Sequence, residues 1–321
     1  MDEELRTDFA GEGALAGARL AEVALYVRDL SASRAFYEEV LGLEPADADS
    51  HSAAYATGPA RLRLRAADDE AVTLADADPS ADLTFLVSDL DGVRNALAAR
   101  GVAFADTMRY VIGATTGFHD PDGHRISLYE PSATAMTWPS GEKIKELVRA
   151  VGKDPAAFGT GAQGGAPAPA GLGGSELVYL FLFVPDADQA MEFYHSVLGL
   201  PYLECRACRR GSTEHQQGVV KYDAGGLMLT THLFEGPEAE AAGALTAAQM
   251  KGLAPVFQVP DVARAAAALA ARGVRTGRVV TSAAERSARF EDPFGRVFHL
   301  RETLPETAEP RAGARAAAGA R

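Results

Sequence analysis

The stretch "FHDPDGHRISLYEP", residues 118–131, has a counterpart in "FEDPFGRVFHLRE", residues 290–302. Each copy has an Asp-Pro turn closed by Gly, followed by a strand in which apolar and polar residues alternate. Two more segments recur in the same order. They are "VRDLSASRAFYEEVLGLEP" (27–45), which returns at 184–202, and "VSDLDGVRNALAARGV" (87–102), which returns at 259–274. The chain is therefore internally duplicated.

Each copy also repeats one local pattern twice. An alternating strand is followed by a V-x-D turn, an amphipathic helix that ends in Gly, and further short strands. The sequence thus predicts an α+β protein of four βαβββ modules, at residues 20–77, 80–132, 176–236 and 252–303. An insertion in the second copy falls at residues 234–252.

The modules group into two predicted domains, residues 20–132 and 176–303. Between them, residues 133–175 predict a connecting helix in "PSGEKIKELVRAVGKD", with Ser140 as its N-cap, and then a flexible Gly/Ala/Pro linker. Residues 1–19 and 304–321 lack apolar periodicity, so we expect both to be disordered tails.

Composition limits the partners. The 321 residues are 47% hydrophobic and carry a formal net charge of −13. A negative chain does not favour binding to nucleic acid or to anionic membrane surfaces. No apolar run reaches the roughly 18 residues of a membrane span, and the first residues are acidic, unlike a secretory signal. We therefore expect a cytoplasmic protein with a small-molecule ligand.

The F-Y-x-x-V-L-G segment after an alternating strand, together with D-P-x-G before a last strand, resembles the vicinal oxygen chelate superfamily. That superfamily includes glyoxalase I, extradiol dioxygenases, fosfomycin-resistance enzymes and bleomycin-binding proteins. The resemblance implies two glyoxalase-like domains whose curved sheets enclose clefts. It also implies metal ligands at the start of a module's first strand and in the centre of its last strand.

In the first copy these positions hold Glu22, Arg63, Asp82 and Ser127, if alternate strand residues face the cleft. Two carboxylates suit a hard cation, but Arg63 would repel it. We therefore expect no metal cofactor, although a divalent metal stays an alternative. The four residues form either a polar ligand site or an internal ion-pair network that includes Arg125.

In the second copy the same positions hold Tyr179, Met228, Ala254 and His299. A ring-cleaving dioxygenase of this superfamily requires two His and one carboxylate, and only His299 qualifies, so that interpretation fails. An irregular metal site built from His215, His232 and His299 remains open.

The second cleft instead has the composition of a small-molecule pocket. Tyr179, Phe181 and Phe183 are expected to stack on a planar ligand, beside Met228, while Thr230, Gln258 and Arg301 orient its polar groups. The alternative is that these aromatic side chains only pack within the protein. His299 is the candidate for proton transfer, with Tyr179 or Gln258 as its orienting partner.

Three hypotheses follow. The first is a metal-independent protein that binds a hydrophobic or aromatic small molecule in the second cleft, in a binding or resistance role. The second is an enzyme of the same superfamily, a lyase, isomerase or oxygenase, that uses His299 or an irregular metal site. The third is a first domain that only supports the second or mediates homodimerisation.

Overall fold

The computed structural model describes residues 13–67, 81–159, 171–206, 219–233 and 252–305. No helix in these ranges has the length and apolar character needed to span a membrane. Module one contains β1 (Arg19–Val27), α1 (Leu30–Ala35) with its π-helical continuation (Phe36–Val40), β2 (Pro45–Ala48), β3 (Ser52–Ala56) and β4 (Arg61–Ala66). Module two contains β5 (Ala81–Leu86), α2 (Leu90–Ala98), β6 (Met108–Tyr110), β7 (Gly113–His119) and β8 (Arg125–Pro131).

The second copy follows the same order of elements. Module three contains β9 (Glu176–Val184), α4 (Ala187–Met191) with its π-helical continuation (Glu192–Val197), β10 (Tyr202–Arg206), β11 (Val219–Asp223) and β12 (Met228–Leu233). Module four contains β13 (Leu253–Gln258), α6 (Val262–Ala270), β14 (Val280–Thr281), β15 (Glu285–Glu291) and β16 (Val297–Thr303). The four predicted modules are therefore confirmed.

The V-x-D turn has the same role in every module. Its Asp is the N-cap of the following helix, and its carboxylate accepts a hydrogen bond from a backbone N–H three residues later. The four caps are Asp29, Asp89, Asp186 and Asp261. One short sequence pattern thus sets the start of all four helices.

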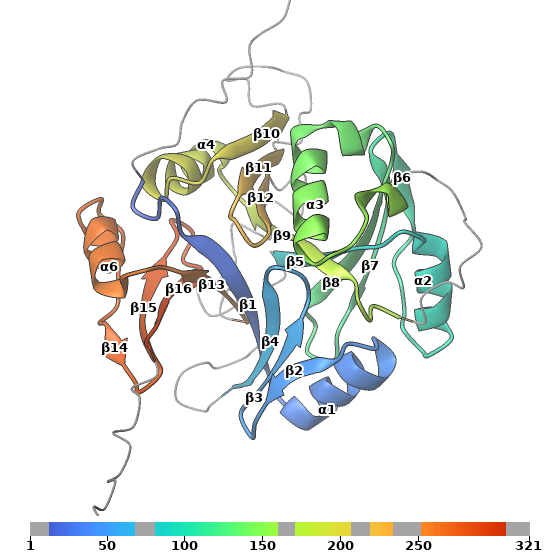
Figure 1. Cartoon of the computed structure of the whole chain (residues 1–321), viewed down its shortest axis with the longest axis horizontal. Helices are drawn as coiled ribbons and strands as arrows, with labels where there is room; N and C mark the ends of the chain where they lie inside the picture. Colours follow the sequence, from blue (N-terminus) through green and yellow to red (C-terminus); the bar gives the residue numbers. More distant parts are fainter. Residues whose placement is uncertain (1–12, 68–80, 160–170, 207–218, 234–251, 306–321) are drawn as a thin grey trace, which may run out of the picture.

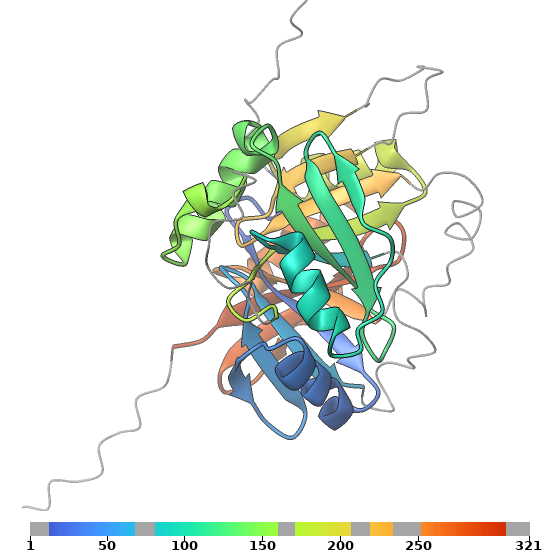
Figure 2. The same cartoon turned by 90° about the vertical axis from the view of Figure 1, so that its right-hand side faces the viewer.

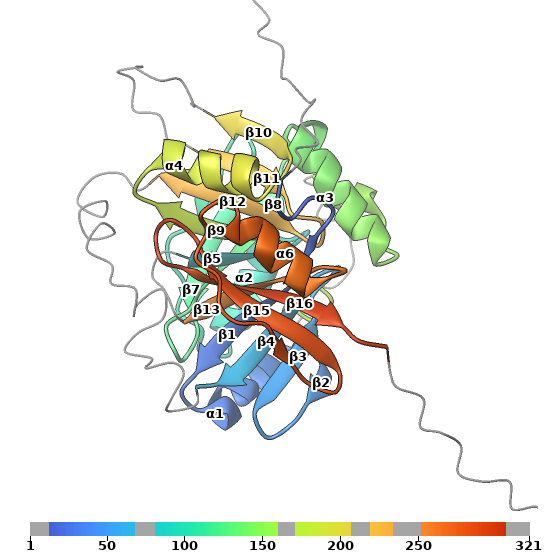
Figure 3. The same cartoon turned by 90° about the vertical axis from the view of Figure 1, so that its left-hand side faces the viewer.

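The modules that share a sheet are not neighbours in sequence. Sheet A has the strand order β14-β15-β16-β13-β1-β4-β3-β2, so it joins module one to module four. Sheet B has the order β10-β11-β12-β9-β5-β8-β7-β6, so it joins module two to module three. Figure 3 shows the result, with the orange-red strands of module four beside the blue strands of module one. The expectation that each copy would enclose its own cleft is therefore wrong.

The joints between modules are antiparallel, whereas the first and last strands of each module run parallel. In sheet A, Ala24 of β1 lies opposite Ala254 of β13. In sheet B, Leu83 of β5 lies opposite Leu180 of β9. Each sheet therefore has an approximate two-fold arrangement about its central strand pair (Figure 1).

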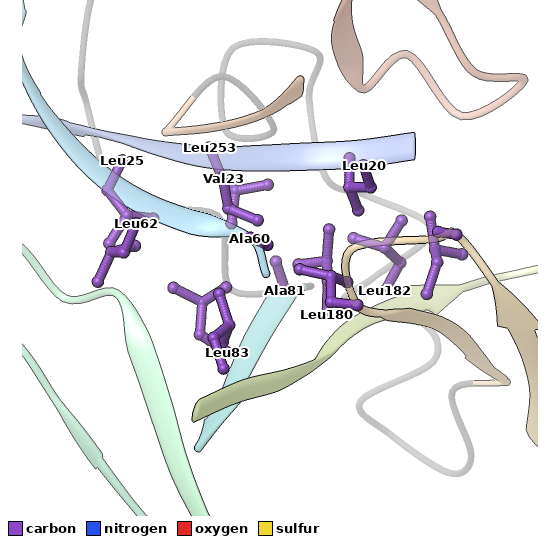
Figure 4. Packing of buried hydrophobic residues seen from close by; sticks show 14 of the residues in the cluster. Leu20, Val23, Leu25, Ala60, Leu62, Ala81, Leu83, Leu180, Leu182 and Leu253 are labelled. Atoms are coloured by element: carbon purple, nitrogen blue, oxygen red, sulfur yellow. The ribbon is translucent and has the colours of Figure 1, made fainter. Parts of the chain in front are cut away.

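The two sheets bury one shared core. Val23 and Leu25 of β1 point toward Leu83 of β5 and Leu180 and Leu182 of β9 (Figure 4), and all are at most 1% exposed. We call this apolar side of each sheet its inner face, and the opposite side its outer face. Because strand residues alternate, Glu22 of β1 and Asp82 of β5 lie on the two outer faces. They are therefore separated by the core.

A buried tyrosine–aspartate hydrogen bond links neighbouring modules. The hydroxyl of Tyr37, in the F-Y segment of module one, donates to Asp120 Oδ2 in the D-P-x-G turn of module two at 2.9 Å. Tyr194 donates to Asp292 Oδ2 at 2.8 Å in the same way. Burial raises the pKa of Asp120, against the opposing effects of His124 and Tyr37. The two sequence motifs of the duplication are thus partners in space.

The connecting segment and the N-terminal tail differ from expectation. The connecting helix is confirmed as α3 (Pro139–Ala150), but its N-cap is Trp138, and Ser140 lies inside its first turn. Leu15, placed in a disordered tail by its sequence, is 3% exposed in the core. In the linker, Leu172 is fully buried and its N–H donates to the Leu41 carbonyl. Residues 1–12, 160–170, 234–251 and 306–321, where the other tail, linker and insertion predictions fall, lie outside the described residues.

The Tyr37–Asp120 bond predicts a stability change. Tyr37→Phe leaves a buried carboxylate oxygen without its donor, so we expect the free energy of unfolding to fall by about 1–3 kcal/mol. Urea denaturation followed by fluorescence measures it. Tyr110→Phe is the control, because that side chain is 53% exposed. Equal losses in the two variants would contradict the assignment.

Candidate functional site

The family positions are divided between the two sheets. Glu22 and Arg63 share the outer face of sheet A with Ala254 and His299. Asp82 and Ser127 share the outer face of sheet B with residues of module three. The predicted grouping of Glu22 and Arg63 with Asp82 and Ser127 is therefore wrong, since it followed the order of the modules in the chain.

The strand pairing also shows which first-strand residue lies beside each last-strand family position. Ala24, Thr84 and Val256, each two residues after the first family position, pair with Arg63, Ser127 and His299 respectively. The corresponding residue of module three is Phe181, and it pairs with Thr230. Thr230 therefore occupies the last-strand position that was assigned to Met228. Thr230 is fully buried, and its hydroxyl has no hydrogen-bond partner among the described residues.

Helix α3 covers part of the outer face of sheet B. Its residues Ile144, Leu147 and Val148 are at most 1% exposed and pack in one cluster with Tyr179 of β9 and Met228 of β12. Figures 1 and 2 show α3 lying along the flank of sheet B next to β9 and β10. This part of the predicted second cleft is therefore filled by the protein itself.

A polar network holds the first turn of α3 on sheet B. The Ser140 hydroxyl donates to Glu204 Oε2 at 2.6 Å, and Lys221 Nζ lies 2.8 Å from Glu204 Oε1. Lys221 Nζ also donates to Ser140 Oγ at 3.1 Å. Although burial acts to raise the pKa of Glu204, Lys221 and Ser140 outweigh it and lower that pKa. The network fixes α3 to β10 and β11.

The three predicted stacking residues have partners within the protein. Tyr179 is 3% exposed and contacts the rings of Tyr129 and Phe181 at centroid distances of 6.0 and 5.4 Å. The ring of Phe183 lies edge-on to His232 at 5.3 Å. The Arg125 guanidinium carbon lies over the Phe183 ring, 5.8 Å from its centroid. The alternative that these aromatic side chains pack within the protein describes them better.

The remaining polar group on sheet B is a small ion pair. Arg125 Nε lies 2.9 Å from Asp82 Oδ2, and the Ser127 hydroxyl donates to the same oxygen at 2.7 Å. Burial raises the pKa of Asp82 to about 6, although Arg125, Ser127 and Thr84 act in the opposite direction. The predicted ion-pair network is therefore real for Asp82 and Arg125, but Glu22 and Arg63 belong to a separate one.

On sheet A, Glu22 is surrounded by arginines. Its carboxylate is fully buried, with Arg63 Nε and Arg301 Nη1 each 3.0 Å from Oε2 and Arg65 Nη2 3.6 Å from Oε1. Burial acts to raise the pKa of Glu22, but Arg301 and Arg63 outweigh it and lower that pKa. Glu22 is thus a permanent anion that orders guanidinium groups from β4 and β16.

Gln258 belongs to the same network. Arg301 Nε donates to Gln258 Oε1 at 3.3 Å, and Gln258 Nε2 donates to the Thr303 hydroxyl at 3.3 Å. Gln258 and Arg301, both expected to orient polar groups of a ligand, thus contact each other. However, both residues are on sheet A, away from Tyr179, Phe181, Phe183 and Thr230 on sheet B.

A cavity of about 480 Å³ lies beside this network. That volume is within the range of small-molecule sites, roughly 300–1,000 Å³. Its lining combines apolar side chains with His299 and two arginines: Tyr26, Leu253, Ala254, Arg275, Thr276, Gly277, Arg289, Phe290, Glu291, Val297 and His299. Among the predicted site residues, His299 alone lines it.

His299 is the titratable base on the cavity wall. Burial, with smaller contributions from Arg289, Arg65 and Arg301, lowers the pKa of His299 to about 4, although Glu22 acts in the opposite direction. Neither ring nitrogen has a hydrogen-bond partner among the described residues. The imidazole is therefore neutral near pH 7, with one donor and one acceptor. The expected orienting bond from Tyr179 or Gln258 is not made.

The residues present do not fit a metal. On sheet A, Glu22 is committed to arginines, Arg63 cannot ligate, and only His299 remains. His232 lies on sheet B and His299 on sheet A, so the irregular site is contradicted for this pair. His215 lies outside the described residues. No group of three or more His, Cys, Asp or Glu side chains suited to a metal occurs in the part of the chain that the structure describes.

Sequence reasoning missed most of the cavity. Arg289 lies on β15, directly opposite His299 in the ladder, and Thr276 and Gly277 precede β14. The alternation of "ERSARFE" already assigns Arg289 to the outer face, because Ala288 and Phe290 are apolar. What the sequence lacked was the knowledge that this face adjoins Glu22.

The packing of α3 predicts a second stability change. Leu147→Ala removes a buried side chain between α3 and sheet B, so we expect the free energy of unfolding to fall by about 2–5 kcal/mol. Val151→Ala, at the 39% exposed end of the helix, should change it by less than about 0.5 kcal/mol. Urea denaturation of both variants provides the measurement. A Leu147→Ala midpoint equal to that of the parent protein would mean that α3 is not part of the folded core.

The low pKa of His299 predicts a pH dependence. The ordinary value is 6.5, so between about pH 6.5 and pH 4 the unfolded chain binds a proton that the folded protein does not. His299 therefore reduces the free energy of unfolding as pH falls through this window. Between pH 6.5 and pH 4, we expect the free energy of unfolding of His299→Gln to fall by up to about 3 kcal/mol less than that of the parent protein. Denaturation at several pH values tests this, and parallel pH curves would contradict it.

Comparison with known proteins gives the relationship of the chain. A sequence model described as the Glyoxalase/Bleomycin resistance protein/Dioxygenase superfamily matches residues 19–128 and 176–300. Glyoxalase I from Zea mays superposes with a TM-score of 0.59 at 14% identity, covering 89% of this chain and 92% of that chain. A "putative dioxygenase" from Bacillus subtilis superposes with a TM-score of 0.55 at 11% identity, covering 89% and 86%.

No curated protein matches the sequence. At these identities the two structures show a shared fold and carry no information about a shared reaction. The family match covers more than half of the chain. The protein therefore belongs to the glyoxalase, bleomycin resistance protein and dioxygenase superfamily, as a tandem α+β member with curved sheets.

Proposed function

We propose that this protein binds a small molecule with an aromatic or aliphatic body in the cavity beside His299, without a metal at the family positions. The observation that carries the proposal is the state of Glu22. Its carboxylate is fully buried and forms ion pairs with Arg63, Arg65 and Arg301. A carboxylate in these contacts is unavailable to a cation, while the cavity next to it is large enough for a ligand.

The proposal moves the ligand from the predicted cleft to sheet A. On sheet B, helix α3 packs against Tyr179. The ring of Phe181 contacts that of Tyr179, and the ring of Phe183 contacts that of His232. On sheet A, apolar residues such as Tyr26 and Val297 line the same cavity as His299, whose ring nitrogens have no hydrogen-bond partner in the part of the chain that the structure describes. The chemistry supported here is reversible binding, as in a binding or resistance role in the cytoplasm.

A second candidate is a metal-independent lyase or isomerase that uses His299. The supporting observation is that a neutral imidazole on a cavity wall can accept a proton from a bound molecule. With a pKa of about 4, however, it is a weak base near neutral pH. The ligand-binding role is therefore the stronger proposal.

Blocking the cavity tests the proposal. Gly277 lines the cavity, and a Cβ added there would meet Arg289 Cβ at 3.6 Å, an ordinary contact, so we choose Gly277→Leu to place a larger side chain in the cavity. We expect at least one of naphthoate, naphthamide and naphthylmethylamine to bind the parent protein, and none to bind this variant. Saturation-transfer NMR measures binding. Thr281→Leu, on exposed β14, is the matched control and should bind as the parent does.

Metal content is the independent check. Protein purified without chelators should contain iron, zinc, nickel and manganese only in substoichiometric amounts by elemental analysis. One metal ion per chain would overturn the metal-free part of the proposal. Binding of the probes to Gly277→Leu with parental affinity would overturn the location of the site.

A further inference from the structure

The outer face of sheet A carries more guanidinium groups than carboxylates. Arg63, Arg65 and Arg301 surround the single buried carboxylate of Glu22, and Arg63 has one further, solvent-exposed partner in Asp47 at 3.9 Å. Arg289 adds another positive charge on the same face. In a chain with a net charge of −13, this local excess of positive charge is opposite in sign to the rest of the molecule.

Unlike Arg275 and Arg286, Arg289 has no ion-pair partner among the described residues. Arg275 pairs with Glu291 at 2.8 Å, and Arg286, on the same strand as Arg289, pairs with Glu302 at 3.0 Å. The guanidinium of Arg289 makes no hydrogen bond or ion pair with any described residue. It lines the cavity, and it lies opposite His299 in the β15–β16 ladder. One cation on the cavity wall is therefore left for a ligand.

The positive potential reaches into the cavity. The protonated form of His299 is disfavoured first by burial and then by Arg289, Arg65 and Arg301, which keeps the pKa of this residue near 4. Burial penalises either charge, but the contribution of the arginines favours an anion at this position. The neutral imidazole adds one N–H donor beside the Arg289 fork.

We propose that the cavity binds an organic carboxylate, whose carboxylate group contacts Arg289 and His299 and whose aromatic or aliphatic body lies against Tyr26 and Val297. This inference names the ligand class of the proposed function and rests on it. A planar guanidinium donates two parallel N–H bonds to a carboxylate, a geometry that a neutral amide of the same shape cannot use as well. Glu22 is then a positioning residue that holds the arginines of β4 and β16 behind the site.

The experiment compares naphthoate with naphthamide by titration calorimetry on the full chain at low ionic strength. The two probes share one ring system and differ in charge. We expect naphthoate to bind the parent protein about tenfold more tightly or better, because a hydrogen bond to a charged group is worth more than a neutral one. Arg289→Gln should abolish this preference, because it weakens naphthoate binding more than naphthamide binding.

Arg286→Gln is the matched control. It removes an arginine from the same strand, but one that pairs with Glu302 and does not line the cavity, so the preference for naphthoate should persist. Equal affinities of the parent protein for the two probes, or a preference that survives Arg289→Gln, would overturn the inference alone. Failure of the parent to bind naphthoate, naphthamide and naphthylmethylamine would overturn the proposed function together with it.

Discussion

The antiparallel pairing of β1 with β13, and of β5 with β9, is the contact on which the rest of the structure depends. It joins the first module of the chain to the last and the two middle modules to each other. Both sheets can then turn their apolar sides toward one shared core (Figure 4). Because the polar sides must face outward, two separate outer faces result, and each receives residues from both copies of the duplication.

These two faces have diverged. On sheet B the connecting helix α3 supplies Ile144, Leu147 and Val148, so a strip of protein occupies space that a ligand would need. On sheet A no helix of the described residues lies over His299, and a cavity remains. The duplication therefore supplied two similar surfaces, of which one is partly covered by α3 and the other carries a cavity.

The charge arrangement on sheet A is the basis of the metal-free part of the proposal. The negative charge of a buried carboxylate must be compensated. For Glu22 the compensating charges are three arginine side chains rather than a metal ion. Burial, together with Arg289, Arg65 and Arg301, lowers the pKa of His299 to about 4, so its imidazole is neutral near pH 7. Arg63, at a position where the resemblance implies a metal ligand, is the reason that we propose an anion rather than a metal cation as the ligand.

The sequence by itself determined the four modules, their Asp-capped helices and the face on which each strand residue lies, because these follow from local hydrogen bonds and from the two-residue period of a strand. It also placed Arg63 and His299 at positions where the family resemblance implies metal ligands. It could not show that Glu22 meets Arg301, 279 residues away, or that α3 covers Tyr179. Those contacts depend on which modules pair, and repeated strands have nearly equal local preferences, so only the packing of the whole chain decides the partner.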